Sequence, residues 1–278
     1  MIKHKKKIKD FLREYAIRPK KKLGQNFIFD KNILDKIATT MGSVEKLNII
    51  EIGPGPGGLT RSLLEKKPKS IVLIEKDLSF KGILSELTKD YPEVFTTLIF
   101  DDFLKIDIEN LIALKKEKVK FISNLPYYIS TQVLLKILPL NSNVLEAIFM
   151  FQKEVAERLI AKPHNKKYSK LTVIAQYCCD IKKIFPLKSS IFYPKPEVDS
   201  CLLSFKKKKN ISNDVLIELK RITKLAFEKR RKTIKNSLAE IEGIGELLSK
   251  LKIDDQFRAE NLSVENYTNL AKSLLKKI

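Results

Sequence analysis

The stretch LNIIEIGPGPGGLT, residues 47–60, leads from a short apolar run through a glycine-rich turn into a helical pattern. Gly53, Gly55 and Gly58 match the G-x-G-x-x-G fingerprint, in which glycines let the backbone approach a ligand at the carboxyl edge of a parallel sheet. Glu75 ends the next apolar run about 20 residues further on, where a carboxylate can accept hydrogen bonds from ribose hydroxyls. The pattern is typical of a nicotinamide dinucleotide site or an S-adenosylmethionine site. A tight strand-to-helix turn without a ligand is the third interpretation.

Two prolines in this turn favour one of these ligands. Pro54 and Pro56 carry no backbone N–H, so the turn offers fewer donors to a pyrophosphate than a loop without proline would. An adenosine cofactor without phosphates does not need those donors. The turn therefore favours S-adenosylmethionine over a nicotinamide dinucleotide.

Further short apolar runs along the chain predict an α/β fold. Helical patterns separate them, and in the first such pattern Asp30 can cap a helix that Gly42 can end. Buried strands that alternate with helices are typical of a doubly wound parallel sheet covered on both faces. Two later runs on either side of the proline-rich turn FYPKPEVDS favour a closing hairpin on the same sheet. The predicted strands are residues 47–52, 70–75, 95–100, 119–124, 144–151, 182–187 and 198–205.

The 278 residues divide into three predicted parts. Residues 1–22 form a basic flexible arm with little to bury, residues 23–206 form the α/β domain, and residues 207–278 form a small all-α domain. In the last part Asp214 opens a helix, and the basic segment FEKRRKTIKNSL, residues 227–238, continues the helical spacing.

The net charge of +21 predicts a polyanionic partner. Residues 1–22 carry 10 basic and 2 acidic side chains, and residues 206–278 carry 18 and 10. Only eight of the basic residues are Arg, so part of the lysine surplus fits genome-wide composition, but that would be spread evenly over the chain. We therefore expect the two ends to hold RNA, with Arg230, Arg231 and Lys232 on phosphates. Ordinary solvated tails are the alternative.

The sequence argues against a membrane protein, a secreted protein and a zinc protein. No run reaches the roughly 18 to 20 apolar residues of a membrane-spanning helix, and the N-terminal segment lacks the apolar region of a signal peptide. The cysteines Cys178, Cys179 and Cys201 form no C-x-x-C pair, and His4 and His164 complete no zinc site. We expect inert thiols, no metal, no membrane contact and a cytoplasmic protein.

The third predicted strand is followed by Asp101 and Asp102. A carboxylate at the carboxyl edge of a parallel sheet can accept a hydrogen bond from the amino group of an adenine. An aspartate at a strand end is also commonly a helix cap or a solvated loop residue. Position alone leaves both the role and the choice between the two aspartates open.

The fourth predicted strand ends in SNLPYY, residues 123–128, which offers several contacts to a planar exocyclic amine. The Asn124 side-chain oxygen can accept one N–H and the Leu125 carbonyl the other. Pro126 stiffens the turn, and Tyr127 supplies a stacking face. The amine lone pair is delocalised into the ring, and two acceptors favour a pyramidal nitrogen that aims the lone pair at an electrophilic methyl group. No strong base is needed before attack. A turn with two exposed tyrosines is the alternative.

Together these segments resemble the ribosomal RNA adenine N6-dimethyltransferase family, with the enzymes that act on small-subunit RNA as the nearest match. The resemblance covers nearly the whole chain after the arm, and the order and spacing of its motifs make it highly specific. The motifs are LGQNFIFD (23–30), EIGPGPGGLT (51–60), the acid in LIEKD (73–77), the aspartate in DDFLKID (101–107), SNLPYYIST (123–131), FYPKPEVDS (192–200) and FEKRRKTIKNSL (227–238).

The resemblance implies an S-adenosylmethionine-dependent, Rossmann-like methyltransferase domain followed by a helical domain. By the same resemblance, Tyr127 and Phe192 stack on a flipped adenine. Ile28 stands where the family often has Leu, a conservative change if the backbone makes the contact. With Gly55 from the fingerprint, the implied cofactor contacts are Asn26, Ile28, Gly53, Glu75, Asp102 and Asn124.

The implied activity is the transfer of two methyl groups to N6 of each of two adjacent adenosines near the 3′ end of small-subunit (16S) ribosomal RNA. The expected enzyme is a monomer that acts on an assembling 30S subunit, by in-line displacement, with positioning and desolvation as the sources of catalysis. Three alternatives stay open. They are a methyltransferase of large-subunit RNA, a nicotinamide-dependent oxidoreductase, and a non-enzymatic RNA-binding protein on the same fold.

Overall fold

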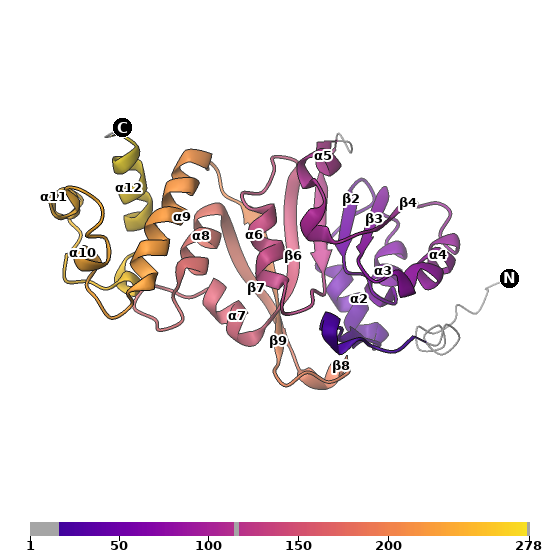
Figure 1. Cartoon of the computed structure of the whole chain (residues 1–278). Coiled ribbons are helices and arrows are strands. Elements are labelled where there is room, and N and C mark those ends of the chain that lie inside the picture. The colour runs from indigo at the N-terminus through magenta and orange to yellow at the C-terminus, as the bar shows by residue number, and fades with distance from the viewer. Residues whose placement is uncertain (1–16, 114–116, 277–278) are drawn as a thin grey trace. The chain divides into compact units, whose positions relative to one another are not determined.

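The computed structural model describes residues 17–113 and 117–276, so the predicted arm lies almost entirely outside the described residues. The chain divides into two compact units (Figure 1). The sheet unit comprises the residues up to 137, residues 141–153 and residues 183–205. The helical unit comprises residues 138–140, residues 154–182 and the residues from 206 on.

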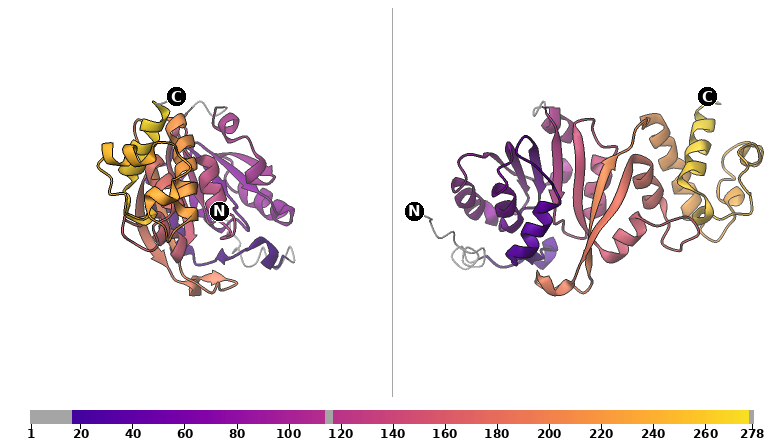
Figure 2. Two further views of the ribbon diagram at one scale, coloured as in Figure 1. Left: turned by 60° about the vertical axis from the view of Figure 1, so that its left-hand side comes forward. Right: turned by 180° about the vertical axis from the view of Figure 1, so that it is seen from behind.

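Seven strands of the described chain form one sheet. They are β2 (Asn48–Ile52), β3 (Ser70–Glu75), β4 (Phe95–Phe100), β5 (Val119–Ser123), β6 (Val144–Gln152), β7 (Cys179–Leu187) and β9 (Ser200–Lys207). Their order is β4-β3-β2-β5-β6-β9-β7, with parallel pairing from β4 to β6 and an antiparallel β9 against β6 (Figures 1 and 2). The predicted parallel sheet and its late antiparallel strands are therefore confirmed.

β2 and β3 lie inside the sheet, each with a neighbouring strand on both sides. Every residue of both strands is buried, as expected for parallel strands covered on both faces. Their carboxyl ends, and that of β5, meet at one edge. The sheet unit also contains η1 (Lys21–Leu23), α2 (Lys31–Thr39), α3 (Gly58–Leu64), η2 (Leu78–Phe80), α4 (Lys81–Lys89), η3 (Phe103–Lys105), α5 (Ile108–Ala113), α6 (Ser130–Ile137) and η4 (Ser189–Ile191).

The helix α2 begins at the predicted cap. The Asp30 side chain accepts hydrogen bonds from the backbone N–H groups of Asn32 and Ile33, which satisfies donors that the first turn leaves free. Gly42, the predicted end signal, has a positive φ of 66° just beyond the helix.

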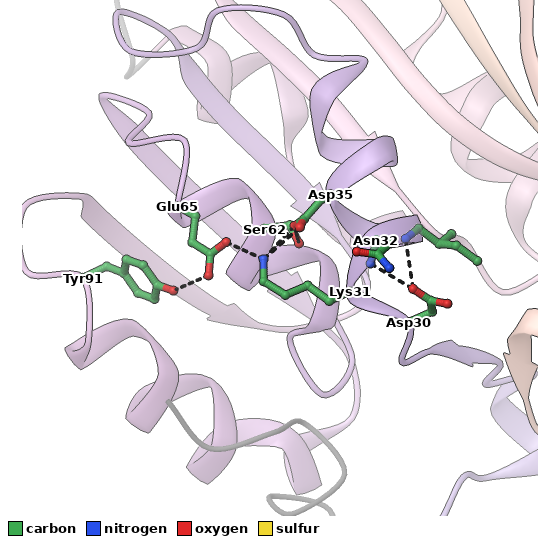
Figure 3. Close-up of polar contacts among 8 residues, drawn as sticks. Asp30, Lys31, Asn32, Asp35, Ser62, Glu65 and Tyr91 are labelled. Carbon is green, nitrogen blue, oxygen red and sulfur yellow. Dashed lines mark hydrogen bonds and ion pairs between the residues drawn. The ribbon is translucent and has the colours of Figure 1, made fainter. Parts of the chain in front are cut away.

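A polar network joins α2 to α3 and to the loop after α4 (Figure 3). Lys31 Nζ lies 2.9 Å from Asp35 and 2.8 Å from Glu65, and the Tyr91 hydroxyl donates to Glu65. The hydrogen bond with Glu65, followed by that with Asp35, raises the pKa of Lys31. Because Lys31 is exposed and Asp35 and Glu65 are partly exposed, their ion pairs add little stability and mainly fix how α2 lies on α3.

Two short strands were not predicted from the sequence. Residues Phe27–Ile28 form β1 and residues Phe192–Tyr193 form β8, and they pair antiparallel with Phe27 opposite Tyr193. Pairing of two-residue strands depends on distant parts of the chain, and no local pattern indicates it. As a result the LGQNFIFD and FYPKPEVDS segments lie side by side.

The helical unit consists of helices around an aromatic core. Phe227 stacks on Tyr267 with ring centroids 6.1 Å apart, and both rings come from helices that pack on each other. The helices are α7 (Lys153–Leu159), whose first residue lies in the sheet unit, α8 (Lys170–Cys178), α9 (Asn213–Glu228), α10 (Ile234–Ser237), α11 (Ile244–Lys250), η5 (Ala259–Asn261) and α12 (Val264–Leu275).

Three expectations for this part of the chain need correction. The helix expected to open at Asp214 begins one residue earlier, at Asn213, and Ser212 caps it, because the Ser212 side chain accepts from the N–H of Val215. The basic segment 227–238 is not one continuous helix: α9 ends at Glu228, and α10 starts after the cap Thr233. Residues 154–182, expected in the α/β domain, belong to the helical unit, since α8 packs on α9 and α12.

The cysteines and the helices add little chemistry of their own. Cys178, Cys179 and Cys201 are buried thiols, and burial raises the pKa of Cys178 to about 12. Within the described residues there is no group of His, Cys, Asp and Glu side chains suited to a metal ion, and no helix is long and apolar enough to cross a membrane.

Candidate active site

A cavity lies at the carboxyl edge of β2, β3 and β5, and encloses about 1060 Å³ when the open solvent at its mouth is included. Its walls come from residues 23–28, 51–56, 58–59, 74–76, 101–103 and 124–129, with Leu34, Ile37 and Phe80. The described chain therefore brings together residues that the sequence motifs place far apart. The predicted site residues on this cavity are Asn26, Ile28, Gly53, Gly55, Glu75, Asp102, Asn124, Leu125, Pro126 and Tyr127.

The glycine-rich turn forms the wall beside β2. Gly55 has a positive φ of 55°, and a Cβ atom there would lie 2.9 Å from the Phe27 ring, so both backbone and space require glycine. The N–H of Gly55 donates to Glu75 Oε2 at 2.9 Å. The turn is thus tied to the end of the neighbouring strand.

Glu75 is a buried carboxylate, 7% exposed, at the end of β3. It accepts hydrogen bonds from the N–H groups of Gly55 and of Asp77, at 2.9 and 2.8 Å. Burial raises the pKa of Glu75, and these two bonds oppose the rise. Since a carboxylate has about four acceptor positions, Glu75 has capacity left for hydroxyl groups in the cavity.

The structure distinguishes the two aspartates after β4, although both line the cavity. Asp101 is exposed, and its side chain accepts from the N–H of Asp102. Asp102 is partly buried, accepts from the N–H of Leu104 and forms an ion pair of 2.9 Å with Lys76. The hydrogen bond from Lys76 lowers the pKa of Asp102, so this carboxylate is charged.

The Asn124 side chain is fixed in one orientation. Its Nδ2 donates to the backbone carbonyl of Asn26 at 3.0 Å. The amide nitrogen is thereby used, and Oδ1 is the atom left to accept a hydrogen bond from a ligand. Leu125, next in the chain, is buried, while Pro126 and Tyr127 are partly buried.

Tyr127 is held through its hydroxyl group. The hydroxyls of Tyr127 and Ser200 are hydrogen-bonded at 2.6 Å, and Ser200 is a buried residue at the start of β9. Burial raises the pKa of Tyr127, and the bond to Ser200 opposes the rise. The ring therefore reaches the cavity from an anchored position, which the sequence motif did not indicate.

Phe192 does not line the cavity. It is 4% exposed and packs in the hydrophobic core, whereas its neighbour Tyr193 is 58% exposed. In the short β1–β8 pair alternate side chains point to opposite faces, which turns Phe192 inward and Tyr193 outward. In this conformation the expected stacking of Phe192 on a base lacks an exposed ring face.

Glu51 is a cavity residue that the sequence reasoning missed. It is 1% exposed, accepts a 2.7 Å hydrogen bond from the Thr60 hydroxyl, and stands near Glu75. Burial, with the charge of Glu75, raises the pKa of Glu51 to about 8. The signal was present as a lone acid within a buried apolar strand, where a charge is costly.

The predicted RNA contacts lie in the helical unit, in the turn between α9 and α10. Arg230 is committed to structure, because it donates to Glu260 at 3.0 Å and to the Lys166 carbonyl at 2.9 Å. All three side chains are exposed, so the difference lies in these contacts of Arg230 and not in burial. The three residues are thus not equivalent.

The mostly parallel sheet with a cavity at its carboxyl edge, lined by acidic residues, is the arrangement of a Rossmann-like methyltransferase domain. The chain belongs to the ribosomal RNA adenine dimethylase family, whose model matches residues 17–276. It is therefore an RNA adenine dimethyltransferase by family.

Individual relatives agree with this membership. The chain is 39% identical to "Ribosomal RNA small subunit methyltransferase A" of Anaplasma phagocytophilum, over 92% of this chain and 95% of the relative. A dimethyladenosine transferase from Plasmodium falciparum shares the fold with a TM-score of 0.72, 24% identity and coverage of 90% and 98%. The 23S rRNA methyltransferase ErmE shares it with a TM-score of 0.67, 21% identity and coverage of 89% and 99%.

Proposed function

We propose that this enzyme transfers methyl groups from S-adenosylmethionine to N6 of two adjacent adenosines near the 3′ end of small-subunit ribosomal RNA. The relatives named for small-subunit RNA support the choice of RNA. The observation that carries the proposal is the fixed orientation of the Asn124 amide, which leaves Oδ1 to accept a hydrogen bond from an adenine amine. Asn124 lines the same cavity as Glu75 and Asp102.

The cavity residues fit S-adenosylmethionine better than a dinucleotide. Acidic side chains predominate among the ionisable residues of the wall: Glu75, Asp101 and Asp102 stand against Lys76, and Glu51 is largely protonated at neutral pH because its pKa is about 8. A cationic ligand suits such a wall, whereas a pyrophosphate would be repelled. Glu75 would hold the ribose hydroxyls and Asp102 the adenine amino group. When bound, the cofactor supplies an electrophilic methyl group on a sulfonium.

The protein then acts by positioning the target adenine. Oδ1 of Asn124 accepts a hydrogen bond from one N–H of the N6 amine. This hydrogen bond orients the nitrogen lone pair toward the methyl donor. Tyr127 provides a stacking face, and the hydrogen bond to Ser200 fixes the plane of its ring. Apolar walls from Phe27, Ile28 and Leu125 keep water away from the reacting atoms.

We further propose that the substrate is an assembling 30S subunit, bound in the cytoplasm by a monomer of this enzyme. The exposed Arg231 and Lys232 would contact phosphates. The location follows from the proposed substrate, since ribosomal subunits assemble in the cytoplasm of bacteria.

Mass spectrometry of the RNA tests the proposal. Purified enzyme and labelled S-adenosylmethionine are incubated with immature 30S subunits and, in parallel, with deproteinised small-subunit RNA and large-subunit RNA. We expect two dimethylated adenosines in the 30S sample and little label elsewhere. Label mainly in large-subunit RNA would contradict the proposed substrate, and label on naked RNA alone would contradict the proposed particle.

A further inference from the structure

Asp77, just beyond the ribose-binding end of β3, gathers an unusual number of hydrogen bonds. Its Oδ1 accepts from Lys20 Nζ at 2.7 Å and from the N–H and hydroxyl of Ser79 at 3.1 and 2.6 Å. Its Oδ2 accepts from Gln25 Nε2 at 2.8 Å. The residue is 5% exposed. A buried carboxylate with donors on both oxygens is a rigid junction.

The charge of Asp77 is secured by these donors. Burial alone would raise its pKa, but the hydrogen bonds from Lys20, Ser79 and Gln25 outweigh that effect and hold the pKa at about 2. Asp77 is therefore ionised at any pH at which the protein works.

The same residue also contacts the predicted ribose carboxylate. The N–H of Asp77 donates to Glu75 Oε1 at 2.8 Å. The other oxygen of Glu75 is held by Gly55. Asp77 thus fixes Glu75 through its backbone while its side chain binds a different part of the chain.

That other part is the segment from Lys20 to Ile28, whose residues 23–28 form one wall of the cavity. The N–H of Lys20 donates to Gln25 Oε1 at 2.8 Å, so both ends of the Gln25 amide are used. At its far end the segment is held by the bond from Asn124 to the Asn26 carbonyl and by pairing with β8. β2 lies between β3 and β5, so the segment is fastened on both sides of the glycine-rich turn.

We propose that Asp77 is a positioning residue for cofactor binding, which holds the Lys20–Ile28 wall in register with Glu75. The inference rests on the proposed function, because it takes the cavity as the S-adenosylmethionine site. Without the bridge the wall loses its attachment near Glu75, and the two halves of the cofactor site are no longer preorganised. The bridge should therefore govern cofactor affinity and leave the methyl-transfer step unchanged.

A purely local role for Asp77 makes a different prediction. Asp77 also caps the short helix η2 through Ser79. Lys20 takes no part in that cap and does not line the cavity. A Lys20 variant would then leave cofactor binding unchanged, whereas the bridge predicts a loss.

The decisive test is an exchange of donor and acceptor in the full-length enzyme, with S-adenosylmethionine affinity measured by calorimetry. Both carboxylate oxygens of Asp77 accept hydrogen bonds. In Asp77→Asn an NH2 group replaces one of these oxygens, so it must face at least one hydrogen-bond donor. In Gln25→Glu the new carboxylate faces the carboxylate of Asp77, and the donor between them is lost. In the double variant Asp77→Asn with Gln25→Glu the acceptor and donor have changed places, and the bond is restored. We expect each single variant to weaken binding about tenfold or more, and the double variant to recover most of the loss.

Further readouts separate positioning from stability. Lys20 does not line the cavity, so Lys20→Met weakens the bridge without touching a ligand, and we expect about a threefold loss of affinity. In the variants that weaken the bridge, turnover at saturating S-adenosylmethionine should stay within about twofold of wild type, while the KM for S-adenosylmethionine rises. Asp107→Asn is the matched control, since Asp107 accepts from the Asn110 N–H away from the cavity, and its affinity should not change.

Two results would overturn the inference. The first is unchanged affinity in folded Asp77→Asn and Lys20→Met. The second is a double variant that binds no better than the single variants, which would reduce Asp77 to its local cap. If Asp77→Asn does not fold, Lys20→Met decides the question alone. Wild-type enzyme that binds no S-adenosylmethionine would instead contradict the proposed function, so the two failures are distinguishable.

Discussion

The side-chain nitrogen of Asn124 donates to the backbone carbonyl of Asn26 at 3.0 Å, and so joins the N-L-P-Y turn after β5 to the wall that carries the LGQNF motif. One hydrogen bond thereby orients the amide oxygen and fastens the wall. In the proposed mechanism, substrate orientation and cofactor enclosure would depend on the same side chain. Single substitutions can separate these two roles from those of the neighbouring residues.

Asn124→Ala should lose methylation by at least about 100-fold, because the target amine is no longer oriented. Binding of the RNA should remain close to wild type, since phosphate contacts dominate its affinity. Single-turnover assays with preformed enzyme–RNA complex measure the two steps separately. A near-normal rate would remove Asn124 from the proposed mechanism.

Glu75→Ala should weaken S-adenosylmethionine binding about tenfold or more, because a charged hydrogen bond contributes roughly 1.5 to 3 kcal/mol. Glu75→Gln keeps the shape and one acceptor, and should lose less. Calorimetry gives both affinities. Equal affinity of folded Glu75→Ala and wild type would place the ribose elsewhere.

Tyr127→Phe should retain much of the activity. It keeps the stacking face and loses the hydrogen bond to Ser200, which is worth about 1 kcal/mol. Tyr127→Ala should lose adenine capture as well, since stacking contributes on the order of 1 to 3 kcal/mol per base. Ser200→Ala serves as the control that removes only the anchor, and it should match Tyr127→Phe. Fluorescence of 2-aminopurine at the target position reports capture directly.

Glu51 should make the stability of the free enzyme depend on pH. Its pKa is raised to about 8 in the folded protein from 4.5, so its stabilising contribution is complete below pH 4.5 and is lost as the pH rises through 8. The isosteric Glu51→Gln removes this dependence. Its advantage in unfolding free energy over wild type should grow from pH 5 to pH 9, and chemical denaturation at several pH values measures it. A constant difference would contradict the raised pKa.

In the basic turn after α9, we expect only Arg231 and Lys232 to bind RNA. Arg231→Gln with Lys232→Gln should weaken RNA binding and lower the salt slope by about 2, one for each phosphate that is no longer neutralised. Arg230→Gln should change the salt slope less, because Arg230 already binds Glu260 and the Lys166 carbonyl, and these exposed contacts add little stability to the helical unit. Binding titrations over a range of salt concentrations give the slopes. An unchanged slope in the double variant would make this turn an ordinary solvated surface.

The sequence was most informative where burial alone decides structure. The runs ending at Ile52 and Glu75 were predicted as strands and are strands, since an apolar run between helical patterns has few other places to go. The Asp30 cap was predictable for a similar reason, because capping is a local interaction. The fingerprint also placed Gly55 and Glu75 together correctly, and they are hydrogen-bonded.

What could not be predicted depends on interactions between distant segments. The orientation of Phe192 follows from its pairing with β1, and the anchoring of Tyr127 follows from Ser200. The assignment of residues 154–182 to the helical unit reflects the packing of α8 on α9, which no local pattern indicates. The roles assigned to the cavity residues remain predictions, although their convergence on one cavity is observed.

The pairing of β1 with β8 also has a consequence for the synthesis of the chain. Phe27 leaves the ribosome early, whereas its partner Tyr193 is added only near the end of the sheet unit. The cavity wall therefore has all its attachments only after β8 has been synthesised. The long loop between β1 and β8 also closes slowly relative to local folding. A nascent chain that already displays the glycine-rich turn and Asn124 still lacks a complete wall around the cavity. An enzyme that methylates ribosomal RNA thus completes its cavity only late in its own synthesis on a ribosome.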